Sequence, residues 1–320
     1  MKLTVLGCGR WGSFLATFHS RFHDVVLWGR EGSHSFTELR EKRANRYLTL
    51  PDSVRLEEDL EAAVSHGEYI IISISAQNLR EFAQRLDQFS LDGKTLILCM
   101  KGIEADTGKR LTQVMEETLS QQVKTAVWVG PGHVEDFMKG VPNCQVVDSA
   151  DPEVTRDIVA NFSSELLRLY RGNDIVGSEI GAAAKNVIGI AAGMLDGKGL
   201  SSLKGALMAR GAREVARLIK AMGGSELSAY GLCHLGDYEA TLFSAHSHNR
   251  RFGESVVKQE PYDLLAEGAA TVIALKKLAE RYQVELPISQ IVYEILYEDK
   301  EVDGALNELF GRSPKGEFEN

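Results

Sequence analysis

The sequence predicts an α/β protein in which a doubly wound parallel sheet is followed by an all-helical C-terminal domain. Up to about residue 177, short apolar runs rich in β-branched residues alternate with amphipathic segments, and beyond that point long helical patterns take over. Continuously apolar strands separated by helices are typical of a parallel sheet covered on both faces. We therefore expect one domain over residues 1–177 and a second over residues 178–320.

The individual elements follow from the same patterns. Five runs are predicted to be buried strands: residues 3–7, 25–29, 69–75, 95–100 and 125–130. Two more runs, 144–149 and 166–170, are candidates to extend the sheet. Helical segments are expected between the strands, as at 58–66 and 79–89, and then at 178–195, 203–222, 262–283 and 288–297.

Composition limits the possible partners. The 320 residues are 44% hydrophobic and 25% charged, with a net charge of −9, so no broad basic surface for nucleic acid or an anionic membrane is expected. No apolar run reaches the roughly 20 residues of a membrane span. The four cysteines are scattered without metal-ligand spacing, which predicts reduced thiols, no metal and a cytoplasmic location. We expect a homodimer that acts on a small molecule.

A glycine-rich turn follows the first predicted strand and opens a helix. Gly7, Gly9 and Gly12 match G-x-G-x-x-G in "VLGCGRWGSF". The first glycine permits the tight turn, the second allows close approach of a pyrophosphate, and the third allows helix–strand packing. The amide groups at the helix N-terminus would bind the phosphates. This context favours a Rossmann-type dinucleotide site over a purely structural turn.

The choice of cofactor depends on the end of the second strand. An acidic residue there binds the 2′-hydroxyl of NAD, whereas an arginine pairs with the 2′-phosphate of NADP. Arg30 comes first in "VVLWGRE" and Glu31 follows it. This order favours NADP, or use of both NADP and NAD.

Lys185 interrupts an otherwise small and apolar helical stretch, "GAAAKNVIG". Helical spacing puts it on one face with Ser178, Gly181, Ala182, Gly189 and Ala192. A lysine on so bare a face is either desolvated beside a space that something else fills, or extends to water at the helix edge. This window alone does not separate the two.

Three further segments carry residues suited to chemistry. Lys101 lies just past a predicted strand, where open α/β sheets bind ligands, although a solvated loop lysine would look the same. Asp237 lies in a Gly-rich turn and could equally be a helix cap. Residues 247–251, "SHNRR", have an anion-binding composition, or form a solvated run of charge.

Taken together, these motifs resemble the bacterial NAD(P)-dependent glycerol-3-phosphate dehydrogenase family over nearly the whole chain. "GCGRWG" is similar to the family's "GAGSWG", "MKG" to "SKG", and "AAKN" to "ALKN". "DGKGLSSLKGALMARGAREVARL" resembles "DGLGLGxNxKAALITRGLxEMxRL". "GLCHLGDY" resembles "GLAGLGDL", "SHNRRFGE" resembles "SRNRRFG", and "AEGAATV" resembles "VEGVxTA".

The resemblance implies an oxidoreductase that interconverts sn-glycerol 3-phosphate and dihydroxyacetone phosphate and feeds glycerophospholipid synthesis. It implies that Lys185 is the general acid/base, and that substrate occupies the space beside its helix face. The expected substrate-binding residues are Lys101, Gly130, Gly132, Asp237, Ser247, His248 and Asn249. The expected cofactor-binding residues are Gly7, Gly9, Arg10, Trp11, Gly12, Arg30, Lys101, Val134, His248 and Glu267.

The chain departs from the family pattern where substrate or cofactor contacts are expected. The family's "SGPSFAxEV" is "VGPGHVEDF" here, so Gly132 takes the position of a serine, and His133 and Val134 follow it. His248 takes the position of an arginine, and Arg10 that of a serine or alanine. Histidine is fully charged only below a pKa of about 6.5.

Two explanations compete. The two histidines, with Arg250 nearby, rebuild the anion site, or the substrate differs from glycerol 3-phosphate. The alternatives in function are a dehydrogenase of another small hydroxy compound and a non-catalytic NAD(P)-binding regulator. Retention of Lys101, Lys185 and Asp237 argues against the regulator, which would not need a proton-transfer lysine.

Overall fold

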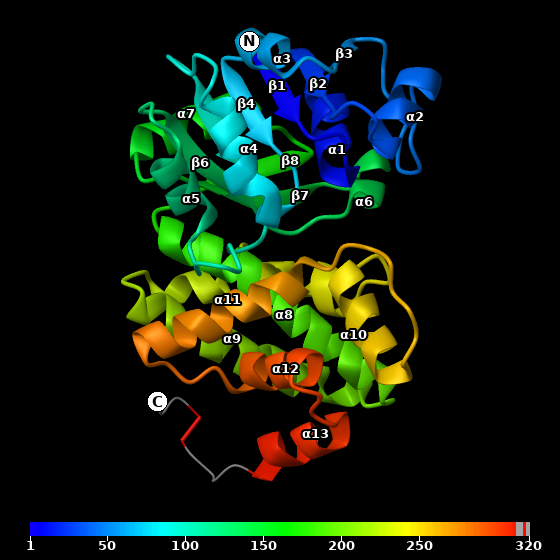
Figure 1. The fold of residues 1–320 in the computed structure, drawn as a ribbon, viewed down its shortest axis with the longest axis vertical. Coiled ribbons are helices and arrows are strands. Elements are labelled where there is room, and N and C mark those ends of the chain that lie inside the picture. Colours follow the sequence, from blue (N-terminus) through cyan, green and yellow to red (C-terminus); the bar gives the residue numbers. More distant parts are fainter. Residues whose placement is uncertain (312–315, 318–320) are drawn as a thin grey trace.

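The computed structural model describes residues 1–311 and 316–317, and it has two domains arranged end to end (Figure 1). The domain that contains the N-terminus is a sheet flanked by helices, and the other consists of helices alone. Residues 312–315 and 318–320 of the expected C-terminal domain lie outside the described part of the chain.

Eight strands in the described residues form one sheet, in the order β3-β2-β1-β4-β5-β6-β7-β8. They are β1 (Lys2–Leu6), β2 (Asp24–Trp28), β3 (Val54–Glu57), β4 (Tyr69–Ile72), β5 (Thr95–Leu98), β6 (Lys124–Val129), β7 (Asn143–Asp148) and β8 (Leu167–Arg171). All seven expected strands are present, and both candidate extensions join the sheet. The strand β3 was not predicted, because its four residues alternate with charges and lie at the sheet edge.

The sheet is parallel, as expected, except at one pair of neighbours, since β6 and β7 run antiparallel. The connection between them holds only the short helix α6 (Val134–Met138), which stays at the carboxyl end of β6. The chain therefore enters β7 from that end and runs back, with Val129 opposite Val146 and Val127 opposite Asp148. The remaining neighbours are parallel.

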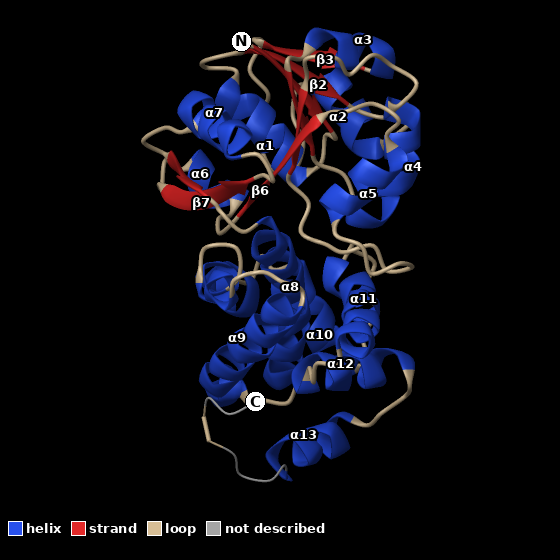
Figure 2. Cartoon of the chain, turned by 90° about the vertical axis from the view of Figure 1, so that its left-hand side faces the viewer, coloured by secondary structure: helices blue, strands red, loops and turns tan. Residues whose placement is uncertain are grey.

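Helices cover both faces of the sheet, as a doubly wound fold requires. Successive strand residues point to opposite faces, so Ile71 joins the apolar cluster on one face and Ile70 and Ile72 join the cluster on the other. Figure 2 shows the two helical layers on either side of the strands. The helices are α1 (Arg10–His19), α2 (His34–Lys42), α3 (Leu60–His66), α4 (Leu79–Leu86), α5 (Leu111–Thr118), α6 and α7 (Pro152–Phe162).

The C-terminal domain is helical, as predicted. Its helices are α8 (Ile175–Gly197), α9 (Lys204–Ala221), α10 (His248–Lys258), α11 (Glu267–Tyr282), α12 (Pro287–Tyr297) and α13 (Val302–Gly311). The helix α8 begins three residues before the expected boundary at 178. By length and composition it alone, among the described residues, could cross a membrane, but 83% of that apolar window is buried inside the protein, as in a core helix.

The helix α10 was not predicted, and it packs on α8 at backbone contact. An ideal Cβ on Gly193 of α8 would lie 1.8 Å from the carbonyl oxygen of Arg250, and one on Gly253 of α10 would lie 2.0 Å from that of Ile190. Both positions therefore require glycine. Part of the small-residue stripe of α8 thus accommodates a neighbouring helix.

Candidate active site

The glycine-rich turn has the geometry that a dinucleotide requires. Gly7 has a φ of +114°, and an ideal Cβ there would lie 2.2 Å from the carbonyl oxygen of Ser73, in the loop after β4. A Cβ on Gly12 would lie 1.9 Å from the carbonyl oxygen of Gly7. By contrast, a Cβ on Gly9, the N-cap of α1, would meet no atom within 4 Å. The turn lies where the strand order reverses between β1 and β4, and its open side fits a pyrophosphate.

Arg10 and Trp11 lie at the start of α1 and connect it to other elements. The Trp11 ring packs 5.2 Å from Phe14 and 6.0 Å from Phe137, measured between centroids. Arg10 forms an ion pair with Glu135 of α6 and donates a 3.4 Å hydrogen bond to the carbonyl oxygen of His246. The guanidinium thus links the two domains beside the glycine-rich turn.

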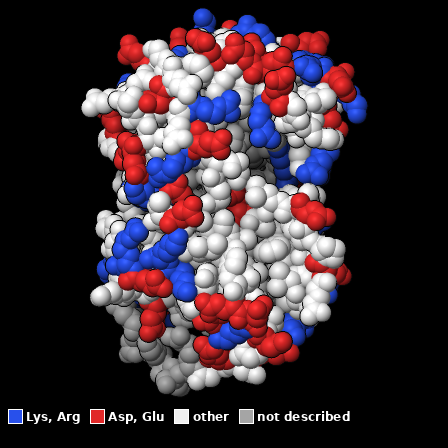
Figure 3. All heavy atoms as spheres, viewed as in Figure 1, with Lys and Arg blue, Asp and Glu red and all other residues white. Residues whose placement is uncertain are grey.

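Arg30 and Glu31 are both exposed just beyond the carboxyl end of β2. The strand β2 is a parallel neighbour of β1, so the carboxyl ends of both strands lie at the same edge of the sheet. Arg30 and Glu31 therefore lie at the edge that carries the glycine-rich turn. On the face viewed in Figure 3, lysine and arginine side chains gather near the level at which the two domains meet. Basic side chains are thus present, among acidic ones, where the two domains meet in a protein of net charge −9.

Three charged side chains from the two domains converge on one point. Lys101 follows β5, Lys185 is on α8, and Asp237 ends the short 3₁₀ turn Leu235–Asp237. The Oδ2 atom of Asp237 lies 2.7 Å from Nζ of Lys101 and 3.1 Å from Nζ of Lys185. Asp237 is 1% exposed and Lys185 6% exposed. Lys185 therefore does not extend to water, which excludes the second interpretation of its position.

Two polar residues that sequence reasoning missed complete this cluster. The hydroxyl of Thr241 accepts a 2.7 Å hydrogen bond from Nζ of Lys185 and donates one of 2.7 Å to the carbonyl oxygen of Asp237. The side-chain oxygen of Asn186 lies 3.3 Å from Nζ of Lys185, and its amide donates to the carbonyl oxygen of Lys101 at 2.8 Å. The spacing of one helical turn between Asp237 and Thr241 was the available signal.

Burial lowers the pKa of Lys185 to about 8. The charge of Asp237 and its hydrogen bond oppose this shift, and the nearby cation of Lys101 adds to it. His234 also faces this region, but burial lowers its pKa to about 4, so it is neutral at pH 7. A lysine with a pKa of about 8 can hold or release a proton near physiological pH, which a general acid/base requires.

The small residues around Lys185 do not leave the open space expected from the sequence. An ideal Cβ on Gly181 would lie 3.0 Å from Sγ of Cys233, and one on Gly189 would lie 2.8 Å from Cγ2 of Thr241. The protein's own segment 233–241 therefore fills much of that helix face. The expectation that a ligand occupies the space along this stripe therefore does not hold at Gly181 and Gly189.

Residues 130–134 lie opposite Lys101. Nζ of Lys101 donates a 2.6 Å hydrogen bond to the carbonyl oxygen of Gly130. Gly130 and Gly132 have φ values of +137° and +136°, and a Cβ on Gly132 would lie 2.4 Å from the ring of Phe137. The serine of the family pattern would therefore be strained here. Val134 is buried as the first residue of α6.

His133 presents a hydrogen-bond donor that no described residue uses. Its Nδ1 lies 3.4 Å from Nη2 of Arg10, which can only donate, so Nδ1 accepts and Nε2 carries the proton. Nε2 is buried without a partner among residues 1–311 and 316–317. Burial and Arg10 lower the pKa of this imidazole, while Asp237 is near enough to oppose the shift.

The start of α10 gives three expected ligands different roles. Ser247 is the N-cap, and its hydroxyl accepts from the backbone N–H of Arg250 at 3.3 Å. The side-chain oxygen of Asn249 accepts from the N–H of Gly268 at 2.9 Å. His248 Nδ1 lies 2.9 Å from the hydroxyl of Tyr262. Both Ser247 and Asn249 therefore also have structural roles.

The surroundings of His248 are electropositive. Burial and the nearby guanidinium groups of Arg10, Arg251 and Arg46 lower the pKa of its imidazole below the usual value. The positive charge that an anion would meet here therefore comes from arginines, with His248 as a neutral partner.

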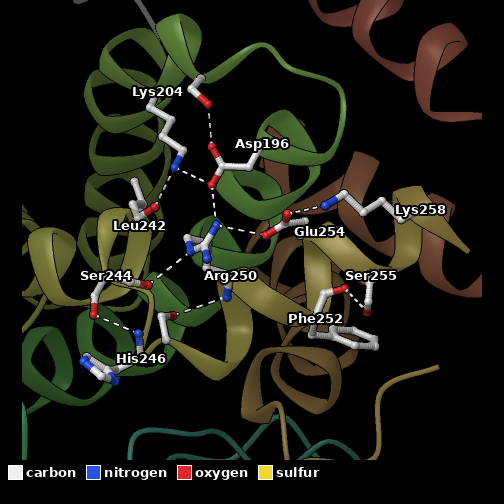
Figure 4. Close-up of polar contacts among 12 residues, drawn as sticks. Asp196, Lys204, Leu242, Ser244, His246, Arg250, Phe252, Glu254, Ser255 and Lys258 are labelled. Carbon is white, nitrogen blue, oxygen red and sulfur yellow. Dashed lines mark hydrogen bonds and ion pairs between the residues drawn. The ribbon is translucent and has the colours of Figure 1, made fainter. Parts of the chain in front are cut away.

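Arg250 does not belong to this anion site. Its guanidinium Nη1 lies 2.7 Å from Oδ2 of Asp196 and 3.1 Å from Oε2 of Glu254, and its Nε donates to the carbonyl oxygen of Ser244 at 3.1 Å. Figure 4 shows these three partners surrounding the guanidinium. The guanidinium of Arg250 is therefore occupied by partners of its own domain, which leaves the two histidines without the help expected from it.

Glu267, the first residue of α11, connects the helical domain to the sheet domain. Its Oε1 accepts a 3.1 Å hydrogen bond from the N–H of Ala76, three residues after Ser73. Burial raises its pKa, and hydrogen bonds from the Ala76 backbone and the Ser75 side chain oppose the rise. Ser73 lies next to Gly7, and Ala76 follows Ser73 by three residues. Glu267 therefore lies at the same edge of the sheet as the glycine-rich turn.

Two residues that differ from the family pattern "GLAGLGDL" depend on each other. His234 replaces a glycine and Tyr238 a leucine. Nδ1 of His234 lies 2.8 Å from the carbonyl oxygen of Gly181, and its Nε2 lies 2.7 Å from the hydroxyl of Tyr238. Both side chains are fully buried. Because Gly181 accepts from Nδ1, the tyrosine must donate to Nε2, and the pair connects the Asp237 turn to α8.

Other features lie apart from the site. A cavity of about 830 Å³ among α8, α9, α12 and α13 is lined mostly by apolar residues such as Ala191 and Ile291, and does not include Lys185. Within the described residues, no group of three or more His, Cys, Asp or Glu side chains could hold a metal ion. All four cysteines are free thiols.

The fold and the site define a class: oxidoreductases with a Rossmann-type domain for a pyridine dinucleotide and a helical domain that completes the active site. Comparison with known proteins narrows this class. Residues 2–155 match the model for the NAD-dependent glycerol-3-phosphate dehydrogenase N-terminus, and residues 174–307 match the model for its C-terminus. The chain belongs to the NAD-dependent glycerol-3-phosphate dehydrogenase family.

Individual relatives agree with this assignment. The chain is 36% identical to the glycerol-3-phosphate dehydrogenase [NAD(P)+] of Prosthecochloris aestuarii, over 99% of this chain and 100% of that protein. The solved structure of the glycerol-3-phosphate dehydrogenase of Coxiella burnetii matches with a TM-score of 0.89 and 28% identity, over 97% of this chain and 98% of that one. The yeast enzyme, at 20% identity and a TM-score of 0.80 over 98% and 99% of the chains, shares the fold.

We predict that Gly132→Ser, which restores the family residue, destabilises the protein. The serine would need a left-handed backbone and would collide with Phe137, and overpacking of this kind costs about 1–3 kcal/mol. Gly140→Ser is the matched control, because Gly140 also has a positive φ, of +81°, but no atom within 4 Å of its Cβ position. Denaturant unfolding of both variants measures the difference, and equal losses would contradict the collision.

Proposed function

We propose that this enzyme interconverts sn-glycerol 3-phosphate and dihydroxyacetone phosphate, with Lys185 as the general acid/base. The observation that carries the proposal is a buried lysine with a pKa of about 8 whose Nζ lies 3.1 Å from Asp237 and 2.7 Å from Thr241. NAD(P), held at the glycine-rich turn of Gly7, Gly9 and Gly12, would supply the chemistry of hydride transfer. During ketone reduction Lys185 donates its proton to the forming alkoxide, and during alcohol oxidation it takes the hydroxyl proton.

The neighbouring groups have separate tasks in this mechanism. Asp237 holds the Lys185 ammonium in place, and it keeps the lysine protonated often enough to act as an acid. Lys101 adds positive charge beside the reacting oxygen, which stabilises the alkoxide. The Nε2–H of His133, for which residues 1–311 and 316–317 offer no acceptor, would be a further neutral donor to the substrate.

We propose that the substrate phosphate binds near His248, Ser247 and Asn249. The arginines that lower the pKa of His248 support an anion at this place. Gly130, Gly132 and Lys101 would contact the glycerol part, since a hydrogen bond from Lys101 to the carbonyl oxygen of Gly130 holds these residues together. Gly132 stands where the family pattern has a serine. This difference favours a second candidate function, a dehydrogenase of another small hydroxy compound.

The proposal assigns the remaining expected residues to the cofactor. Gly7, Gly9 and Gly12 with the N-terminus of α1 would hold the pyrophosphate, and Arg30 would pair with the 2′-phosphate of NADP. We propose a slight preference for NADP because Arg30 precedes Glu31. The other expected cofactor contacts are Arg10, Trp11, Lys101, Val134, His248 and Glu267.

We further propose that the enzyme works in the cytoplasm as a homodimer and supplies glycerol 3-phosphate for glycerophospholipid synthesis. The four free thiols support a reducing compartment. Exposed apolar side chains, such as Leu227 at 73% and Leu265 at 61%, offer surface for a second subunit.

We predict that His248→Ala discriminates between the two substrate classes. If His248 binds phosphate, kcat/KM for dihydroxyacetone phosphate falls about tenfold, the value of one hydrogen bond to a charged group. At saturating NADPH, which removes the effect of a His248 contact with the cofactor, the value for dihydroxyacetone, which lacks the phosphate, does not change. Initial rates of NADPH oxidation with both ketones measure this. Equal changes, or a wild type that favours the unphosphorylated ketone, would support the alternative substrate.

We predict that Lys185→Ala folds and binds cofactor but loses about 10²–10⁴-fold in turnover. Lys198→Ala is the matched control, since Lys198 lies at the end of the same helix and pairs with Asp303 far from the site. Circular dichroism and NADPH fluorescence report folding and cofactor binding. Near wild-type turnover in the purified variant would remove Lys185 from the mechanism.

The pH dependence of the wild type provides the second half of this test. Lys185 is cationic below its pKa of about 8, so kcat/KM for ketone reduction should fall as pH rises through about 8, and that for alcohol oxidation should rise. The substrate phosphate titrates near pH 6. His133 and His248 have lowered pKa values and stay neutral in this range. The transition should be absent from the residual activity of Lys185→Ala.

We predict that Arg30→Ala weakens NADPH binding about tenfold or more and leaves NADH binding nearly unchanged, because only NADPH carries a 2′-phosphate. Glu31→Ala should act in the opposite sense, weakening NADH and sparing NADPH. Fluorescence titration of both cofactors against both variants measures the four affinities. Equal losses of NADH and NADPH in Arg30→Ala would refute the assignment.

A further inference from the structure

A single π-helical turn, Glu239–Phe243, connects Asp237 to the start of α10. Such turns are rare in proteins, and those that occur are often found at functional sites. Thr241 lies in the middle of this turn, where its hydroxyl contacts Nζ of Lys185 at 2.7 Å. The position of that hydroxyl therefore depends on how the turn is held.

Two cations hold the end of the turn by its carbonyl groups. Nζ of Lys204 donates to the carbonyl oxygen of Leu242 at 2.9 Å, and Nε of Arg250 donates to that of Ser244 at 3.1 Å. Figure 4 shows Lys204 approaching from α9 and Arg250 from α10. The residue that Lys204 fixes is directly next to Thr241.

Both cations converge on one carboxylate. Oδ2 of Asp196, near the end of α8, lies 2.6 Å from Nζ of Lys204 and 2.7 Å from Nη1 of Arg250, and its Oδ1 accepts from Ser201 at 2.7 Å. Burial alone would raise the pKa of Asp196, but the hydrogen bonds from Lys204, Ser201 and Arg250 lower it overall. Asp196 is therefore an anion that fixes both side chains.

Burial makes this arrangement rigid. Lys204 is 5% exposed, so its ammonium cannot move to water without losing all of its present partners. The contact between Gly193 and the Arg250 backbone keeps α10 against the same end of α8. The helix α8 thus bears both Lys185 and Asp196, and through Asp196 it supports the turn Glu239–Phe243 that contacts Lys185.

We propose that Lys204, held by Asp196, is a positioning residue for catalysis: it fixes the Leu242 carbonyl and thereby keeps the Thr241 hydroxyl against Lys185. Lys204 does not touch the reacting groups and acts only through the π-helical turn. The proposal rests on the proposed role of Lys185.

The test compares Lys204→Met with Lys204→Arg, and uses Lys198→Met as the matched control, since Lys198 forms an exposed pair with Asp303. We expect Lys204→Met to lower kcat for dihydroxyacetone phosphate about 10- to 100-fold, the cost of a small misplacement, with little change in NADPH affinity. Lys204→Arg should recover part of the loss, and Lys198→Met should match the wild type.

The pH profile separates positioning from a merely structural role. The Thr241 hydroxyl accepts a hydrogen bond from the Lys185 ammonium and stabilises the cation, so its withdrawal should move the transition in kcat/KM to lower pH. Asp237 and Lys101 also face this ammonium, and His234 lies nearby as a neutral group. Thr241→Val should produce the same shift, and the double variant with Lys204→Met should be no worse than Thr241→Val alone.

Each outcome decides the proposal. An unchanged pH profile in Lys204→Met, or losses that add to those of Thr241→Val, would overturn it. Asp196→Asn, which keeps the shape of the side chain, supplies the same comparison if Lys204→Met does not fold. Failure of the proposed role of Lys185 would be recognised separately. In that case kcat/KM of the wild type would show no transition near pH 8, or the transition would persist in Lys185→Ala.

Discussion

The structure depends on one carboxylate that two lysines share. Asp237 lies between Lys101 of the sheet domain and Lys185 of the helical domain, at 2.7 and 3.1 Å. Without it, two cations would face each other in a largely buried place, where their repulsion is strong. With it, the group of three carries one net positive charge, which suits a site for a negatively charged substrate. The same carboxylate limits how far burial lowers the pKa of Lys185.

The helix α8 is the framework on which this arrangement is built. Its glycines make room for other parts of the chain, since Gly181 faces the side chain of Cys233 and Gly193 faces the backbone of Arg250. The segment that bears Asp237 and Thr241 is thereby pressed against the helix that bears Lys185. Close packing of this kind leaves few alternative positions for the side chains. Precise placement of the ammonium group follows from packing along the whole helix.

Positions at which the chain departs from the family pattern are supported by compensating contacts. His234 and Tyr238 replace two apolar or small residues and satisfy each other by a 2.7 Å hydrogen bond in a fully buried place. Gly132 replaces a serine where the ring of Phe137 leaves no room for a side chain. Around His248, where the family pattern has an arginine, the guanidinium groups of Arg10, Arg251 and Arg46 are near enough to lower the pKa of the imidazole. Each change is thus coupled to its surroundings.

The sequence by itself determined the two domains, seven strands and the glycine-rich turn, because periodicity and glycine spacing are local properties of the chain. It also singled out Lys101 and Lys185 as candidate site residues. It also determined the family. Tertiary structure alone decided the antiparallel β7, the helix α10, and the partners of Thr241 and Arg250. These depend on how separate segments of the chain meet, such as Val129 of β6 with Val146 of β7, or Asp196 with Arg250 at a separation of 54. A charged residue shows in the sequence that it needs a partner, but only the folded chain determines which partner it meets.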